Sequence, residues 1–97
     1  MIHHIVLIRW REQTSAADIE LAITGLKEEL QTIDGVAEVA MGASLGLLQA
    51  NAYNYALTAR LRTREALLAY APHPTHQRAL GRLAPLMAEA VIVDFEV

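Results

Sequence analysis

Hydrophobic positions along the 97-residue chain follow two different periods, and the first stretch has the period of a strand. Residues 2–10 are rich in Ile and Val, which favours an extended conformation. Their side chains alternate between two faces, one with Ile2, His4, Val6, Ile8 and Trp10 and the other with His3, Ile5, Leu7 and Arg9. Both faces are mostly apolar, so we expect this strand to be covered on both sides.

A helical period follows the first strand. Ser15 and Asp18 have the spacing of a capping box, and Gly35 supplies a helix stop. Between them, apolar residues recur every three or four positions at Ile19, Ala22, Ile23, Leu26, Leu30 and Ile33. This spacing predicts one helix whose apolar stripe packs in the core.

Three more stretches, 36–41, 51–61 and 90–97, are typical of strands, and a glycine-containing loop over 42–51 joins the first two. One face of 51–61 carries Tyr53, Tyr55, Leu57, Ala59 and Leu61. In 90–97 the alternation places Val91, Val93, Phe95 and Val97 on one face and Ile92, Asp94 and Glu96 on the other. We expect Asp94 and Glu96 at a sheet edge or in a dimer barrel rather than in acid catalysis.

Residues 63–87 contain two helical patterns separated by a proline-rich turn. Thr63 can cap the first helix, and Pro72 should end it near Tyr70 because the residue before a proline avoids the helical region. Pro74 suits the first position of the second helix, with His73 near its N-cap, and Pro85 should disturb its end.

The second of these helices should carry a histidine on its apolar face. His76, Leu80, Leu83 and Met87 follow one another at spacings of four, three and four, which places them on one side of a helix. We therefore expect His76 to point toward the apolar interior.

The predicted order is strand, helix, strand, strand, helix pair, strand. This order is typical of an α+β, ferredoxin-like domain (βαββαβ) over residues 1–97, with its helices on one face of an antiparallel sheet. Apolar side chains on the other face, such as Ile5 and Leu7, need a cover. A second copy of the sheet is the simplest one, which predicts a homodimer with a shared α+β barrel.

Composition narrows the class of protein. The hydrophobic fraction of 54% exceeds the usual value of about 45–50% and supports self-association. A net charge of −3 without a run of like charges argues against nucleic-acid binding. The absence of cysteine excludes disulfides and thiol chemistry. With no apolar run of membrane-spanning length and no signal-peptide pattern, we expect a soluble cytoplasmic protein with no membrane association.

Several segments together resemble one known family. The opening strand His4–Trp10, the segments Thr63–Leu67 and Tyr70–His76, and the closing Val93–Phe95 are similar to those of the stress-responsive dimeric A/B barrel (Dabb) domain. The resemblance covers essentially the whole chain, and the Tyr-x-x-His-Pro-x-His spacing is its most specific part. It implies a ferredoxin-like subunit and a homodimeric barrel.

The resemblance also implies a candidate site. Many members of the family have no assigned activity, but one plant branch cyclises linear polyketides by an aldol condensation without a cofactor. Its acid–base residues match His4 and His76, assisted by Tyr70. That branch has a tyrosine on the first helix, whereas this chain has apolar residues there. His4, His76 and Tyr70 are thus the candidate catalytic residues, with no cofactor and no metal.

Two functions remain open at this level. The first is a cofactor-free cyclase, lyase or isomerase acting on a carbonyl compound with an apolar portion. The second is a non-catalytic, stress-related dimer that binds a small hydrophobic ligand or a protein partner. For the first, we expect the imidazoles of His4 and His76 on the helix-facing side of the sheet, within about 3–6 Å or bridged by one water, with Tyr70 nearby. A metal site formed by His4, His73 and His76 is the weaker alternative.

Overall fold

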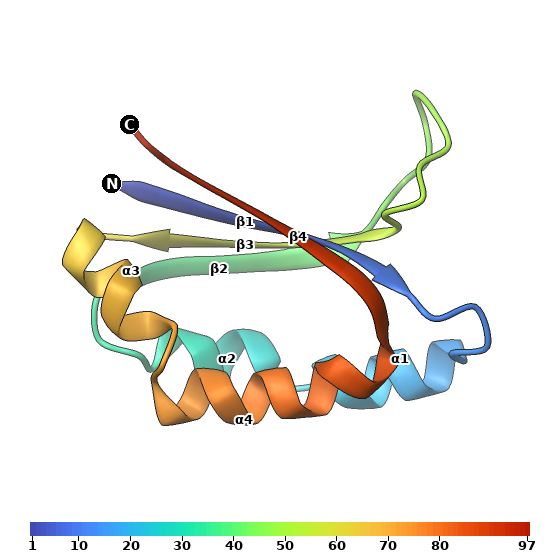
Figure 1. Cartoon of the computed structure of the whole chain (residues 1–97), viewed down its shortest axis with the longest axis horizontal. Coiled ribbons are helices and arrows are strands. Elements are labelled where there is room, and N and C mark those ends of the chain that lie inside the picture. The colour runs from blue at the N-terminus through green and yellow to red at the C-terminus, as the bar shows by residue number, and fades with distance from the viewer.

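The protein folds into a four-stranded antiparallel sheet with all of its helices on one face (Figure 1). The structure, a computed structural model, describes residues 1–97. Its elements in chain order are β1 (Ile2–Trp10), α1 (Ala16–Ile23), α2 (Leu26–Gln31), β2 (Val36–Ala43), β3 (Tyr55–Leu61), α3 (Arg64–Tyr70), α4 (Pro74–Leu83) and β4 (Met87–Glu96). The strand order is β2-β3-β1-β4, which confirms the predicted ferredoxin-like α+β fold.

Strand β1 lies inside the sheet, between β3 and β4, and its two faces have different environments. The predicted inner residues Ile2, His4, Ile8 and Trp10 are buried against the helix layer. The core beneath the sheet also contains Leu26 and Leu30 of α2. The other face of the sheet, which we call the open face, has no helix over it (Figure 1).

The prediction of one long helix after Ser15 is wrong, because the structure has two helices in this stretch. α1 ends at Ile23, and Gly25 adopts a left-handed conformation (φ +76°) at the N-cap of α2. Glycine tolerates this conformation because it has no Cβ. The apolar stripe nevertheless continues across the break, since Ala22, Leu26 and Leu30 are all buried. The break redirects the chain without removing the stripe from the core.

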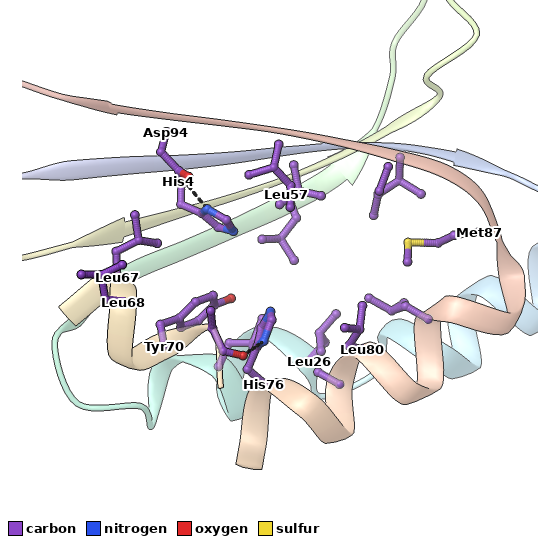
Figure 2. A pocket seen from close by; sticks show the side chains of 18 residues that line it. His4, Leu26, Leu57, Leu67, Leu68, Tyr70, His76, Leu80, Met87 and Asp94 are labelled. Atoms are coloured by element: carbon purple, nitrogen blue, oxygen red, sulfur yellow. Dashed lines mark hydrogen bonds and ion pairs between the residues drawn. The ribbon is translucent and has the colours of Figure 1, made fainter. Parts of the chain in front are cut away.

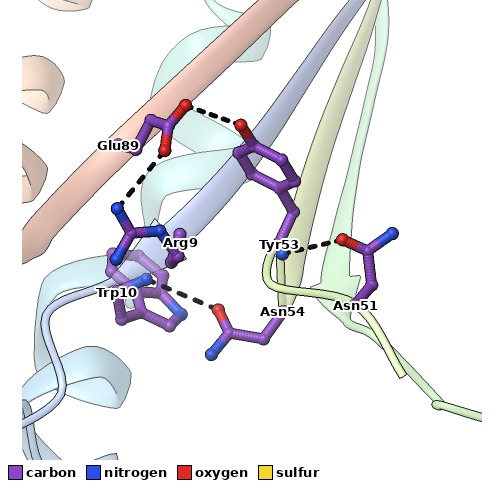
Figure 3. Close-up of polar contacts among 6 residues, drawn as sticks. All are labelled: Arg9, Trp10, Asn51, Tyr53, Asn54 and Glu89. Carbon is purple, nitrogen blue, oxygen red and sulfur yellow. Dashed lines mark hydrogen bonds and ion pairs between the residues drawn. The ribbon is translucent and has the colours of Figure 1, made fainter.

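Strand boundaries also differ from the prediction. The third strand begins at Tyr55 rather than at residue 51, so Tyr53 lies outside it. The Tyr53 hydroxyl instead donates a hydrogen bond to Glu89 Oε1 over 2.6 Å, as Figure 3 shows. The last strand begins at Met87 rather than at residue 90, so Met87 belongs to β4 and not to the second helix. The second strand continues to Ala43.

The turn between α3 and α4 follows its sequence signals. The Thr63 Oγ1 atom accepts a hydrogen bond from the Ala66 backbone N–H over 3.0 Å and caps α3. Pro74 opens α4, and His73 is its N-cap. Pro85 lies in a single 3₁₀ turn, Ala84–Leu86, that ends the helix and leads into β4.

One close approach fixes the start of β2 against α3. Gly35 has a φ of +88°, and a Cβ atom at this position would lie 2.5 Å from the Ala66 Cβ. The chain therefore needs glycine here both for its backbone conformation and for space.

The helices of the chain are short, and none has the length and apolar character needed to cross a membrane.

Candidate functional site

A pocket of about 400 Å³ lies between the sheet and the helices α3 and α4 (Figure 2). Fifteen of its 18 lining residues are hydrophobic, and the other three are His4, His76 and Asp94. Tyr70 lines the pocket with its aromatic ring and adds a hydroxyl. The structure thus brings all three candidate residues predicted from the sequence, His4, Tyr70 and His76, to one cavity.

His4 enters the pocket from β1, and its partner comes from the neighbouring strand. His4 is 7% exposed, and its Nδ1 lies 2.5 Å from Asp94 Oδ1. The two residues are directly opposite in the β1–β4 register, so their side chains share the helix-facing side of the sheet. Because the carboxylate only accepts, His4 Nδ1 donates the proton and Nε2 carries the lone pair in the neutral ring.

The second nitrogen of His4 is accessible from the pocket. His4 Nε2 has no hydrogen-bond partner in the protein, yet no side-chain nitrogen or oxygen is fully buried without a partner. The atom must therefore retain contact with solvent, which the pocket supplies. In Figure 2 the imidazole of His4 projects from the sheet toward the helices.

His76 enters from α4, on the opposite wall, and its ring is oriented in a comparable way. Its Nδ1 donates a hydrogen bond to the Ala71 carbonyl oxygen over 2.8 Å. The turn between α3 and α4 brings this carbonyl, five residues earlier, next to the ring. Since a carbonyl cannot donate, the neutral ring again carries its lone pair on Nε2. His76 faces the pocket, as predicted, but it is half-buried and part of its side chain remains in contact with solvent.

Tyr70 packs against both imidazoles. Its ring centroid lies 5.6 Å from that of His4 and 4.6 Å from that of His76. The side chain is 2% exposed, and this burial raises the pKa of Tyr70 to about 12. The hydroxyl is therefore protonated at neutral pH and able to donate a hydrogen bond. It has no partner in the protein and, since no side-chain oxygen is fully buried without one, it faces the pocket.

The structure places the three candidate residues around one cavity. His4 and His76 line one pocket on the helix-facing side, and Tyr70 lies next to both. The direct separation of about 3–6 Å between the two imidazoles stays a prediction. His73 is not part of the pocket, because its Nδ1 accepts a hydrogen bond from the Thr75 backbone N–H over 3.1 Å at the start of α4. No group of three or more His, Asp or Glu side chains is arranged to hold a metal ion.

Asp94 is the pocket residue that the sequence did not assign to the candidate site. We expected it at a sheet edge or in a dimer barrel; β4 is indeed an edge strand, but the Asp94 side chain lies on the pocket side. No local sequence signal gives this position, because it follows from the register of the two terminal strands, whose ends also pair through the hydrogen bond from the Val97 N–H to the Met1 carbonyl. With the terminal strands aligned in this way, residue 4 must face residue 94.

The pocket opens along the edge strand. Leu68 of α3, Leu80 of α4 and Ile92 of β4 line it and are 74%, 39% and 58% exposed. These apolar side chains form a rim between solvent and the polar residues. A molecule that enters here passes apolar side chains before it reaches His4, Tyr70 and His76.

The polar residues can move protons at an apolar site. Two imidazoles with their Nδ1 atoms already bonded each present an Nε2 that can take a proton when neutral or give one when charged. A protonated tyrosine beside them can donate a hydrogen bond to an oxygen that gains negative charge. A ferredoxin-like subunit with such a pocket defines a class of small α+β protein rather than one activity.

Comparison with known proteins identifies the family. The sequence model of one protein family, the stress responsive A/B barrel domain (Dabb), matches residues 2–97, and the chain belongs to this family. It is 27% identical over 96 residues to a stress-response A/B barrel domain-containing protein of Arabidopsis thaliana. That match covers 98% of this chain, which spans only about a third (36%) of the length of the plant protein.

Solved structures agree on the fold. A dimeric ferredoxin-like protein of unknown function from Thermobifida fusca is 36% identical, with a TM-score of 0.88 over 99% of this chain and 90% of that chain. A hydroxynitrile lyase from Passiflora edulis is 18% identical, with a TM-score of 0.85 over 99% of this chain and 92% of that chain. At that identity the second likeness concerns the fold alone.

Proposed function

We propose that this protein is a cofactor-free acid–base enzyme that acts on a carbonyl compound with an apolar portion. One observation carries the proposal: His4 and His76 each have a bonded Nδ1 and an Nε2 left for a ligand, next to the Tyr70 hydroxyl, in an otherwise apolar pocket. A fully buried imidazole held only for packing would need both nitrogens bonded, whereas each of these two presents one nitrogen to the pocket.

Each residue has a distinct role in the proposed reaction. His4 Nε2 removes a proton from the carbon next to the substrate carbonyl, and Asp94 stabilises the imidazolium that forms. The electron pair of the broken C–H bond moves to the carbonyl oxygen, and Tyr70 donates a hydrogen bond to the resulting enolate. His76, when protonated, returns a proton to the intermediate. The sequence of steps ends with both histidines exchanging protons with water.

The lining also indicates the charge of the ligand. The pocket contains one carboxylate, Asp94, and neither Lys nor Arg. An anionic head group would therefore find no fixed cation and would lie near a negative charge. A volume of about 400 Å³ falls within the usual range for small-molecule sites. We propose a neutral carbonyl ligand with a hydrophobic body. The hydroxynitrile lyase with this fold supports the view that such a scaffold can host lyase chemistry.

The test is exchange of carbon-bound hydrogen. We would incubate 4-phenyl-2-butanone with the protein in D₂O and follow loss of the protons next to the carbonyl by NMR. The wild type should accelerate exchange over an equal concentration of free imidazole, and His4→Leu and His76→Leu should each reduce the acceleration about tenfold or more. His73→Asn is the matched control, because asparagine keeps the N-cap and the residue lies outside the pocket.

Two outcomes would reject catalysis. If the wild type were no faster than imidazole, the acid–base proposal would fail. If the ketone bound, as seen by shifts in protein NMR signals, but did not exchange, the alternative of a non-catalytic hydrophobic-ligand protein would replace it. That alternative is favoured by one feature, the apolar character of 15 of the 18 lining residues.

We also propose that the chain is a homodimer. The open face carries exposed apolar side chains, Val93 and Phe95 of β4 among them, at 54% and 47%. The similar protein from Thermobifida fusca is described as dimeric. Stacking two open faces would cover these residues and close a barrel. Light scattering coupled to size exclusion at micromolar concentration should give twice the monomer mass of 10.7 kDa, and a monomer would reject the barrel.

A further inference from the structure

The segment between β2 and β3 contains the most exposed leucines of the protein. Leu45, Leu47 and Leu48 are 82%, 81% and 101% exposed. Residues 44–49, which we call the leucine loop, contain no charged side chain. Single exposed leucines are common, but three in four positions form an apolar surface that the monomer leaves in water.

The base of this loop is fixed by hydrogen bonds (Figure 3). The Asn54 backbone N–H donates to the Ile8 carbonyl over 3.0 Å, and the Ser44 N–H donates to the Asn54 carbonyl over 2.9 Å. The Tyr53 hydroxyl bonds to Glu89, which also accepts from Arg9. These contacts tie the loop to β1 and to the far edge strand β4. These bonds define where the loop leaves the sheet, on both of its sides.

The loop and the open face lie on the same side of the sheet. In Figure 1 the chain between β2 and β3 rises away from the sheet on the side opposite the helices. A second hollow, of about 510 Å³, separates the loop from open-face residues such as Leu7 and Ala56. The exposed apolar stripe of β4, Val93 and Phe95, faces the same side. The leucine loop and the open face are thus two uncovered apolar surfaces on the same side of the sheet.

We propose that the leucine loop of each protomer packs against the open face of a second copy of this chain and clasps it. The occupant is a second copy because the loop adjoins the open face that the proposed homodimer would cover. A two-fold axis would then apply the same clasp twice, each loop on its partner's sheet. The loop is uncharged, which suits the apolar stripe of β4 and offers nothing specific to a charged partner. The inference rests on the homodimer proposed above.

The test compares two leucines of nearly equal exposure. Leu47→Ser alters the loop, and Leu21→Ser is the matched control because Leu21 is 78% exposed on α1, on the helix side of the protein. Burying a leucine at an interface changes a dissociation constant by about tenfold or more. Because the two-fold axis applies the contact twice, the free-energy change doubles and the dissociation constant changes by about a hundredfold. We expect Leu47→Ser to raise the dimer dissociation constant about a hundredfold in sedimentation equilibrium, and Leu21→Ser to leave it within about threefold of the wild type.

The outcomes separate this proposal from the others. Equal dissociation constants for Leu47→Ser and Leu21→Ser, with the wild type dimeric, would overturn the clasp and keep the dimer; the loop would then face another molecule. A monomeric wild type would overturn both. A second variant, with Leu45, Leu47 and Leu48 all changed to Ser, should be monomeric at micromolar concentration and keep the wild-type circular dichroism spectrum. Ketone exchange tests the pocket independently of all three variants.

Discussion

Replacing His76 with Leu tests whether this histidine is retained for chemistry or for stability. The substitution removes the hydrogen bond to the Ala71 carbonyl, a loss of about 0.5–1.5 kcal/mol. The carbonyl is not orphaned, because Gln77 Nε2 also donates to it over 2.8 Å. Leucine gains about 1 kcal/mol from partial burial beside Tyr70 and a few tenths from helix propensity.

These terms nearly cancel, so we expect the free energy of unfolding to change by less than about 1 kcal/mol. Urea denaturation followed by circular dichroism measures it, at one fixed protein concentration because the proposed dimer makes stability concentration-dependent. Leu83→Ala, on the same helix and 7% exposed, is the control and should lose about 2–5 kcal/mol. A loss above about 2 kcal/mol for His76→Leu would refute the reasoning and make His76 part of the core architecture.

Three further predictions concern stability. Burial raises the pKa of Tyr70 from 10.0 to about 12, so the stability that the neutral phenol contributes is complete below pH 10 and should be lost between pH 10 and 12, by about 3 kcal/mol. Urea denaturation at pH 9 and 11 should show a smaller loss of stability in Tyr70→Phe than in the wild type, and equal losses would contradict the assignment. Gly35→Ala should lower the free energy of unfolding by about 2–4 kcal/mol, whereas Gly42→Ala, with no atom within 4 Å, should stay within about 0.5 kcal/mol. A chelator should leave the melting temperature unchanged, since no group of His, Asp or Glu side chains is arranged to hold a metal ion. A drop of several degrees would support the three-histidine metal site instead.

The parts of the fold that the sequence predicted well are those with local causes. The alternation of residues 2–10 defined both faces of β1. Thr63 and Pro72 marked the start and the end of α3, and Pro74 marked the start of α4. The break at Gly25 was missed because the apolar stripe continues through it, and one glycine inside a helix is tolerated at a cost of about 1 kcal/mol. Periodicity reports which side chains are buried and says little about the path of the chain between them.

The candidate site divides in the same way. His76 could be placed from its own helix, and His4 from its own strand, because each position follows from a local period. Asp94 and Tyr53 could not, since their partners, His4 and Glu89, lie 90 and 36 residues away. Their roles depend on strand register and on a loop path, which arise only when distant segments pair.

The pleat of β4 places two surfaces back to back on one edge strand. Asp94 faces the pocket, while its sequence neighbours Val93 and Phe95 face the open side, where we propose that the partner packs. A ligand that orders the pocket side of β4 would also order the side offered to the partner. By thermodynamic linkage, dimerisation would then tighten ligand binding by the same factor as the ligand tightens the dimer. Diluting the protein should therefore weaken its apparent affinity for a ligand.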